Sequence, residues 1–354
     1  MDLDTDAVFH HLVPQTYMRG WKHGKSSVYF IAKNDENIDQ DWTRNTKRLA
    51  GIDYFYSRRA GALYRTKKDC KKFFKPLSGY RVVLENQVLT HPLELNDHFS
   101  RYDKWDIYLL NGTKVSEEKK QSLKKEILNI HVRDIEAGWD YYYENFWNSI
   151  VEDILGQLIR NRYSSSIKAV RRSELIKFMV SLEWRTSPSH PVFMEIYEEL
   201  LDIVNLSSLK TMKIPEENRL YSFLDTEYKE FIHNILLKYY YEFLNDRGPI
   251  IVEANKIINE LTVELLIAPL DTEFITSDNP VCRLQNSANR TEYVFPINNK
   301  ILCAIRKNSS LIPTEFYRVN YLNKNRVFYY NEALRKNCTE GYILKEKNLS
   351  LYFK

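Results

Sequence analysis

Apolar side chains recur at every third or fourth position through the middle of the chain. From residue 135 to residue 163 these positions form one broad stripe, which predicts a long amphipathic helix. The stripe consists of Trp139, Tyr142, Tyr143, Phe146, Trp147, Ile150, Ile154, Leu158 and Ile159. The same periodicity predicts further helices over 173–184, 191–204 and 216–245. A helical layer is therefore expected from residue 116 to residue 248.

Short runs of β-branched and aromatic residues flank this helical stretch on both sides. In the amino-terminal part they predict strands over 27–32 and 80–84, after a short helix that starts behind Pro14 and ends at Gly20. In the carboxyl-terminal part they predict strands over 263–267, 273–276, 292–297 and 301–305, a helix over 319–336 and an edge strand over 341–344. The expected fold class is α+β, with a helix-rich core and small mixed β regions from both the N-terminal and C-terminal parts of the chain.

No internal repeat, low-complexity tract or glycine-serine linker interrupts the chain. With 354 residues, of which 44% are hydrophobic, it is long enough to bury a large core. We therefore expect a single compact domain over 1–354. It would consist of an N-terminal mixed region (10–115), a helical region (116–248) and a C-terminal strand-rich region (249–354).

Cysteine usage and hydropathy indicate the compartment. The four cysteines lie far apart and form no C-x-x-C pair, so they are expected to be reduced thiols rather than metal ligands. No run approaches the roughly 20 apolar residues that span a bilayer, and the first seven residues carry three aspartates where a signal peptide carries cations. A cytoplasmic protein without a membrane contact is expected. A divalent metal stays an option without a clear ligand motif, and the oligomeric state stays open.

Positive charge is concentrated in one segment. The whole chain has a net charge of only +4, but the stretch from Lys47 to Lys75 holds ten basic and two acidic residues, a local +8. Six aromatic residues are interleaved with these cations, and cations with stacking surfaces are what nucleic-acid binding needs. The alternative is a solvated basic face whose aromatics belong to the core. The candidate nucleic-acid contacts are Arg58, Arg59, Arg65, Lys67, Lys68, Lys71 and Lys72.

A second candidate site lies near the amino terminus, around His11. If a helix starts after Pro14, Gln15 and Arg19 share one face of it, with Tyr17 between them and His11 just before it. A histidine, an amide and a guanidinium beside a helix start suit an anion such as phosphate. The alternative is structural, with His11 as a cap and Arg19 paired to a buried carboxylate. The segment also resembles the first half of an HNH nuclease motif, but the asparagine and histidine of the second half do not follow.

Two further polar groups stand at element ends. Ser277, Asp278 and Asn279 precede a proline after an apolar run, which is typical of an Asx turn and also of a place where sites are built. Asp278 could orient His11, whereas Ser277 lacks the Gly-x-Ser-x-Gly elbow of a nucleophile. Arg185 closes a predicted helix, where it can serve as a C-terminal cation or face a shared pocket.

These polar groups belong to sequence blocks that occur together in a known family. The blocks are His11 to Trp21 (HLVPQTYMRGW), Asp53 to Ser57 (DYFYS), Trp184 to Thr186 (WRT), Phe274 to Val281 (FITSDNPV) and Phe295 to Ile297 (FPI). In this order they resemble domain-of-unknown-function family 4238, a bacterial family, over roughly residues 10 to 345. Trp21 stands where the family more often has phenylalanine, and Ser187 where proline is common. The resemblance implies an architecture and candidate positions, and no reaction.

Two functions follow from these observations and both stay open. The first is an enzyme or toxin-like effector that acts on a phosphate-containing substrate, for example a hydrolase or nuclease in antiviral defence. His11 would transfer the proton, Arg19 and Arg185 would hold anionic oxygens, and Asp278 would orient His11. The second is a non-catalytic nucleic-acid- or protein-binding module in which the same residues form a buried network. The first function requires the amino-terminal block to lie beside the turn near residue 280.

Overall fold

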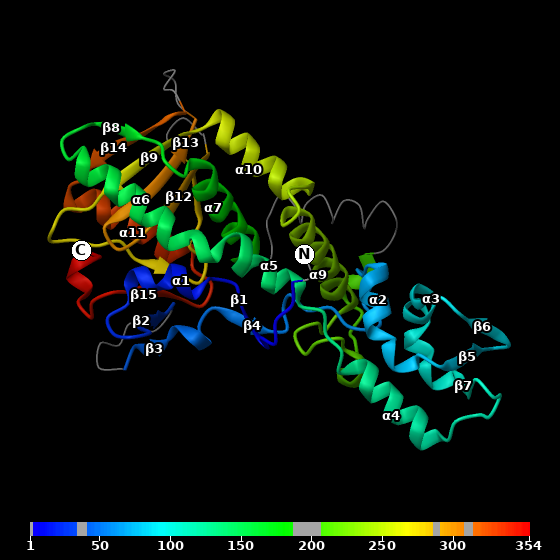
Figure 1. Cartoon of the computed structure of the whole chain (residues 1–354). Helices are drawn as coiled ribbons and strands as arrows, with labels where there is room; N and C mark the ends of the chain where they lie inside the picture. The colour runs from blue at the N-terminus through cyan, green and yellow to red at the C-terminus, as the bar shows by residue number, and fades with distance from the viewer. Residues whose placement is uncertain (1–2, 34–40, 187–206, 286–290, 308–313) are drawn as a thin grey trace. The chain divides into compact units, whose positions relative to one another are not determined.

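The computed structural model describes the whole chain except residues 1–2, 34–40, 187–206, 286–290 and 308–313 (Figure 1). The described chain divides into two compact units, each assembled from separate stretches of sequence. Unit 1 comprises Met1–Val8, Tyr54–Gly138 and Met194–Leu244, and unit 2 comprises Phe9–Asp53, Trp139–Phe193 and Asn245–Lys354. Unit 1 thus draws on the expected N-terminal and helical regions, and unit 2 draws on all three expected regions. A single domain over 1–354 stays a prediction.

Unit 2 is built around a six-stranded mixed sheet. Its strands, in spatial order, are β11 (Cys282–Gln285), β12 (Thr291–Pro296), β13 (Ile301–Arg306), β9 (Thr262–Ile267), β14 (Phe316–Tyr321) and β8 (Ser166–Lys168). All neighbours are antiparallel except β14 and β9, which run parallel with Val319 opposite Leu265. The helices of this unit are α1 (Gln15–Met18), α6 (Trp147–Arg160), α7 (Arg172–Thr186), α10 (Gly248–Glu260) and α11 (Lys324–Asn337).

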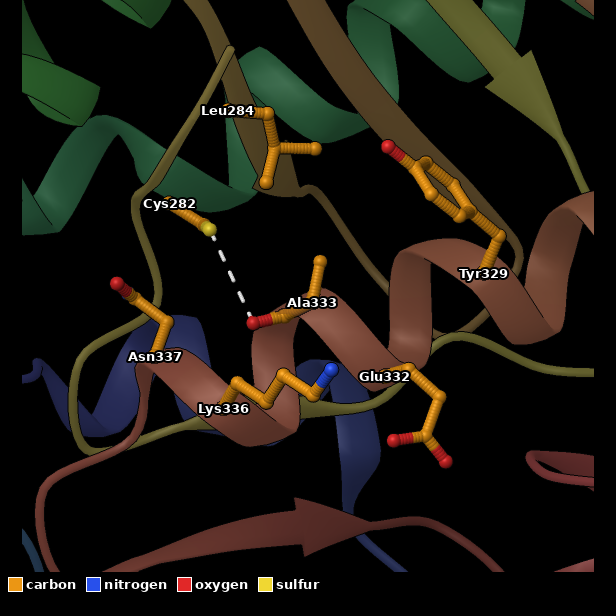
Figure 2. Close-up of a pocket in the computed structure, with 7 residues that line it drawn as sticks. All are labelled: Cys282, Leu284, Tyr329, Glu332, Ala333, Lys336 and Asn337. Atoms are coloured by element: carbon orange, nitrogen blue, oxygen red, sulfur yellow. Dashed lines mark hydrogen bonds between the residues drawn. The ribbon is translucent and has the colours of Figure 1, made fainter.

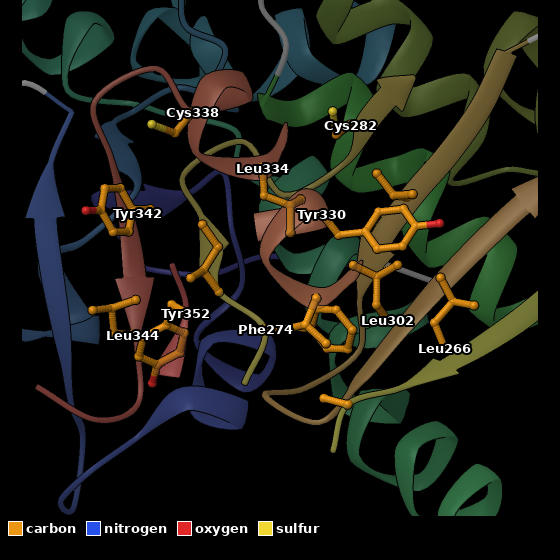
Figure 3. Packing of buried hydrophobic residues seen from close by; sticks show 14 of the residues in the cluster. Leu266, Phe274, Cys282, Leu302, Tyr330, Leu334, Cys338, Tyr342, Leu344 and Tyr352 are labelled. Carbon is orange, nitrogen blue, oxygen red and sulfur yellow. The ribbon is translucent and has the colours of Figure 1, made fainter. Parts of the chain in front are cut away.

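A four-stranded sheet joins the two ends of the chain within unit 2. Its spatial order is β10 (Thr276–Ser277), β15 (Gly341–Leu344), β2 (Ser27–Ala32) and β3 (Thr43–Asn45). A further pair consists of β1 (Phe9–His11) and β4 (Gly51–Asp53). Buried residues of α11 such as Tyr330 and Leu334 share one apolar cluster with Leu302 of β13 and Leu344 of β15, as Figure 3 shows. Helix α11 therefore packs in the core where residues of both sheets meet.

Unit 1 combines a small antiparallel sheet with helices. The sheet has the order β6 (Gln87–Leu89), β5 (Tyr80–Leu84) and β7 (Asp106–Leu109). The helices are α2 (Lys67–Phe73), α3 (Pro92–Asp97), α4 (Glu117–Leu128) and α9 (Glu227–Phe243), and the chain leaves the unit within α5 (Asp134–Tyr142). Phe73 of α2, Val82 of β5, Leu95 of α3 and Ile127 of α4 share an apolar core with Trp105, which precedes β7.

The structure confirms the α+β class and several boundaries, and it corrects others. Strands 27–32 and 80–84 lie where the sequence predicts them. The predicted helix 135–163 is interrupted, because Tyr143 leaves the helical region (φ −131°, ψ −53°) and Glu144 starts a short 3₁₀ turn. At this interruption Glu144 pairs with the buried Arg185, a tertiary contact that overrides the continuous periodicity.

Three further predictions near the carboxyl end were wrong in part. The helix predicted over 216–245 begins only at Glu227, where the side chain of Thr226 caps it. The helical region is expected to end at residue 248, but Gly248-Pro249 opens the unpredicted helix α10, because proline fits the first turn. The segment predicted as helix 319–336 is strand β14 followed by α11, which Asn323 caps.

The remaining differences concern strands. Strand 341–344 was predicted at a sheet edge, but β15 lies between β10 and β2, and all four of its residues are buried. The strand predicted over 273–276 is reduced to the two residues of β10. The helix predicted over 191–204 lies outside the described residues.

Candidate functional site

His11 is the last residue of β1 and is half-buried. Its ring nitrogen Nε2 lies 3.1 Å from the carbonyl oxygen of Thr46. Because only a protonated nitrogen can donate to a carbonyl, this contact places the proton on Nε2 and leaves a lone pair on Nδ1. Burial lowers the pKa of His11, the Thr46 contact raises it, and the positive charge of Arg185 lowers it further. The net shift is downward, so the ring is uncharged at neutral pH.

Arg185, in the last turn of α7, is almost fully buried at 1% exposure. Its Nη2 donates to the carbonyl oxygen of His11 and lies 2.8 Å from Oε1 of Glu144. The guanidinium also sits 4.9 Å from the ring centroid of Trp139. Burial raises the pKa of Glu144, and Arg185 opposes that shift. The guanidinium is thus engaged through Nη2 by protein groups, and the assignment of Arg185 to substrate binding stays a prediction.

Tyr17 is fully buried and belongs to the core of unit 2. Its hydroxyl donates to the carbonyl oxygen of Pro296 at 2.9 Å, so the hydroxyl of Thr276, 2.7 Å away, donates to Tyr17. Its ring stacks on that of Phe295, with the centroids 5.4 Å apart. Burial raises the pKa of Tyr17 far above its usual range. These contacts give Tyr17 a structural role in the core, and its assignment to substrate binding stays a prediction.

The turn after β10 is held by side chains that bond to backbone. The Ser277 hydroxyl accepts a hydrogen bond from the Asn279 amide nitrogen at 3.1 Å. The Asn279 side chain accepts from the Thr186 hydroxyl at 3.0 Å and donates to the carbonyl oxygen of Asn337 at 3.1 Å. Asn337 donates in return to the Asn279 and Val281 carbonyls, both at 2.9 Å. The turn therefore differs from the predicted Asx turn, because its local bond is made by the Ser277 hydroxyl, whereas the side chain of Asn279 ties the turn to α7 and to the end of α11.

Asp278 caps the chain just before β15. Its carboxylate accepts hydrogen bonds from the backbone nitrogens of Thr339 (3.0 Å) and Glu340 (2.6 Å). Burial raises the pKa of Asp278, and these backbone bonds lower it. Among the described residues, no hydrogen bond or ion pair joins Asp278 to His11, so the expected orienting contact is not formed.

Two consecutive residues of α7 link the amino-terminal block to the late turn. Arg185 holds the backbone of His11, and Thr186 holds the side chain of Asn279. Three of the sequence blocks therefore meet in unit 2: His11 to Trp21, Trp184 to Thr186 and Phe274 to Val281. Gln15 is half-buried and Arg19 is exposed, and neither side chain makes a hydrogen bond or ion pair to another described residue. Their assignment to substrate binding stays a prediction.

A cavity of about 410 Å³ opens beside the turn, between β11 and α11. Figure 2 shows Cys282 and Leu284 on one side and Tyr329, Lys336 and Asn337 on the other. Burial raises the pKa of the Cys282 thiol to about 11, so the thiol stays protonated and is a poor nucleophile at neutral pH. None of the residues predicted as site residues lines this cavity.

In unit 1 the arginines of the basic segment are engaged by protein groups. Arg58 is fully buried between Asp69 (3.0 Å) and Asp134 (2.9 Å), which together raise its pKa against the effect of burial. Arg59 donates to the Arg219 carbonyl at 2.7 Å, and Arg65 pairs with Asp97. Four of the interleaved aromatics lie in the core: Phe55, Tyr56, Phe73 and Phe74. The buried guanidinium of Arg58 is thus neutralised within the protein, and its contact with nucleic acid stays a prediction.

The lysines of the same segment point outward. Lys67, Lys68 and Lys71 on α2 and Lys75 in the following 3₁₀ turn are exposed, and half-buried Lys72 lies 3.5 Å from Asp4. The acidic residue of this helix, Asp69, is turned inward to Arg58 and accepts a hydrogen bond from the Thr66 amide nitrogen. We call Lys67, Lys71 and Lys75 the lysine row. None of its three members has an ion pair with a described residue.

Next to the lysine row is a second cavity, of about 580 Å³. Lys71 and Arg81 line it together with Ser78, Tyr80 and Thr90 and a set of apolar residues. Arg81, Ser78 and Thr90 are not among the site residues predicted from the sequence. The sequence does indicate that the side chain of Arg81 is exposed, because Arg81 alternates with the apolar and buried Val82 on β5, a strand that was predicted correctly.

A buried charged group on the six-stranded sheet was also missed. Glu264 and Glu292 are each 6% exposed, and Arg306 pairs with both, at 3.5 Å from Glu292. Burial raises the pKa of Glu292, and Arg306 opposes this. Both glutamates interrupt otherwise apolar strands, which is the sequence signal that was overlooked. Among the described residues no three His, Cys, Asp or Glu side chains are grouped to hold a metal ion.

In the described part of the chain, no helix combines the length and the apolar character needed to cross a bilayer.

Comparisons with known proteins give one match. Neither a curated protein nor a solved structure matches the chain. A family model described as "Protein of unknown function (DUF4238)" matches residues 10–347. This match covers nearly the whole chain and includes every block from His11 to Ile297, so the chain belongs to the DUF4238 family.

Proposed function

We propose that this protein binds a nucleic acid through the lysine row of unit 1. The observation that supports the proposal is the sorting of charge around α2. Asp69 faces inward to Arg58, whereas Lys67, Lys71 and Lys75 face solvent without a described acidic partner. Exposed cations that are not neutralised by the protein itself remain available to phosphates.

Spacing within the lysine row also suits a polymer that carries a charge on every unit. Lys67 and Lys71 are four residues apart, so they lie one above the other, about 6 Å apart along the helix axis. Lys75 continues the series at the start of the next 3₁₀ turn. Binding of this kind releases counterions and is therefore expected to weaken steeply as salt rises.

The test removes the row and compares it with a charge-matched control. The triple variant K67A/K71A/K75A is expected to bind a labelled 20-nucleotide single strand roughly tenfold more weakly or worse at low salt. Its plot of log affinity against log salt should be shallower by about 2, at about 0.7 per lost contact with a single strand. The measurement is fluorescence anisotropy over a salt series.

The control variant K22A/K125A/K168A removes three exposed lysines outside the row and gives the same net charge. It should keep wild-type affinity and slope. Equal losses in both triple variants would mean that total charge, and not this surface, governs binding. A wild-type protein without salt-dependent binding would end the proposal.

A second candidate function is hydrolysis of a phosphate ester with His11 as the base. It is favoured by the contact of Nε2 with the Thr46 carbonyl, since an uncharged ring with a lone pair on Nδ1 is the form that accepts a proton. No described hydrogen bond ends on Nδ1. This candidate does not depend on Arg185 or Asp278, whose side chains are engaged elsewhere.

The variant His11→Gln tests this candidate, because glutamine keeps a nitrogen donor for the Thr46 carbonyl and lacks the basic nitrogen. If His11 is the base, turnover of a phosphodiester substrate should fall by about 10²–10⁴, with the melting temperature nearly unchanged. A loss of thermal stability with unchanged turnover would instead assign His11 a structural role. A wild-type protein that does not hydrolyse phosphodiesters would exclude the candidate.

A further inference from the structure

The cavity of about 580 Å³ in unit 1 has an apolar floor and a cationic rim. Leu77, Val82 and Leu89 in its lining are buried, whereas Lys71 and Arg81 at the rim are exposed. The central guanidinium carbon of Arg81 lies over the ring of Tyr108 on the neighbouring strand β7, 5.0 Å from the ring centroid. Concave sites of this size, lined by apolar side chains with a few polar groups, are typical of places that bind organic ligands.

Lys71 belongs to both the lysine row and this cavity. A polyanion that follows the lysine row therefore passes the mouth of the cavity with one phosphate at Lys71. The group attached to that phosphate then stands within reach of the apolar floor and of the Tyr80 ring. In a nucleic acid this group is a base, whose flat faces stack on aromatic rings and on arginine planes.

We infer that this cavity takes an unpaired base of single-stranded nucleic acid. The inference rests on the proposed function and adds the substrate class to it. In a duplex the bases are stacked and paired inside the helix, so only a single strand can place a base in the cavity while its phosphates stay on the lysine row. The hydroxyls of Ser78 and Thr90 at the rim offer hydrogen bonds to the edge of a base.

An acidic amphipathic peptide is the competing occupant of an apolar cavity with a cationic rim. The lysine row favours the nucleic acid, since its cations continue beyond the cavity at regular spacing. A peptide that fills the cavity needs only the two cations at the rim, Lys71 and Arg81. It would leave Lys67 and Lys75 without a role.

The experiment fills the cavity without changing charge. Ser78 is exposed at the rim, so Ser78→Trp should block the cavity and leave the fold intact. The control is Ser122→Trp, which adds the same ring at an exposed position on α4. The ligands are a labelled 20-nucleotide single strand, its duplex, and the same strand with abasic sites in place of bases, each measured by anisotropy.

The wild type and Ser122→Trp should bind the single strand about tenfold more tightly than the duplex or the abasic strand. Ser78→Trp should lose this preference and keep the duplex affinity within about twofold. A second filling variant, Thr90→Trp, should behave like Ser78→Trp, which guards against a local folding defect in either one.

Equal binding of all three ligands by the wild type would overturn this inference and leave the lysine row as a general phosphate-binding surface. Absence of binding to every ligand would remove the proposed function as well. If Ser78→Trp left oligonucleotide binding unchanged and abolished binding of an acidic amphipathic peptide, the cavity would be a peptide site.

Discussion

Replacing Arg185 by alanine is expected to lower the free energy of unfolding by about 3–5 kcal/mol. The reason is that Arg185 is 1% exposed and pairs with Glu144 at 2.8 Å, so its removal leaves a buried carboxylate without its cation. The change also removes the hydrogen bond to the His11 carbonyl and the contact with the Trp139 ring. Urea denaturation followed by circular dichroism measures the loss.

The control for this prediction is Arg171→Ala. Arg171 pairs with Asp153 at 3.0 Å, but both side chains are substantially exposed, so the loss should be much smaller. The double variant R185M/E144L should be more stable than R185A alone, because it removes both charges from the core together. Similar stability of Arg185→Ala and Arg171→Ala would show that the buried pair is dispensable, and would reopen Arg185 as a ligand-binding residue.

The second large effect is expected in unit 1 from Arg58→Ala, with a loss of about 3–5 kcal/mol. Arg58 lies between Asp69 and Asp134, and the Asp69 side chain is only 4% exposed. Without the arginine, two carboxylates near each other lose their shared cation. Adding Asp69→Asn to Arg58→Ala should recover part of the loss, which a double-mutant cycle measures.

Nucleic-acid affinity separates this structural role from a binding role. Measured under conditions where Arg58→Ala is folded, its affinity for a single strand should equal that of the wild type, because the guanidinium is buried. Arg65→Ala serves as the stability control, since Arg65 and its partner Asp97 are both partly exposed and the loss should be smaller. A drop in affinity for Arg58→Ala with no drop in stability would contradict the assignment.

Local sequence patterns predicted the secondary structure correctly where the residues of a segment favour only one kind of element. Ser27–Ala32 and Tyr80–Leu84 combine strand-forming residues with turn residues on either side, and both appear with the predicted bounds. Gly248-Pro249 is compatible with two local structures, since glycine and proline often follow the end of a helix and proline also favours the first turn of the next one. The apolar positions of α10, Ile250, Ala254 and Ile257, have helical spacing and would have decided between them.

The interior position of β15 could also have been predicted from the sequence, because three of its four residues, Tyr342, Ile343 and Leu344, are large and mainly apolar. All four residues are buried in the structure. A strand of this kind is typical of a sheet interior and not of an edge. The break at Tyr143, by contrast, could not be predicted. It accompanies the pairing of Glu144 with Arg185, a residue on a different helix 41 positions along the chain.

Candidate sites were harder to predict than elements, because a residue type does not reveal its partner. Arg58 and Lys71 stand in the same basic segment, yet one is buried between aspartates and the other is exposed. Asp69 could have been recognised, since Thr66 three residues before it predicts a capping box that turns both side chains toward the backbone. The partner Asp134 is 76 positions from Arg58, and only the folded chain reveals it.

The pairing of β2 with β15 sets the moment at which unit 2 can be completed during synthesis. Residues Gly341–Leu344 lie far downstream of their hydrogen-bonded neighbours Ser27–Ala32, so they are synthesised much later. Until then β2 exposes an unpaired edge, and unpaired edges in nascent chains are prone to aggregation. A premature stop before Gly341 would therefore leave β2 without the neighbour that shields this edge.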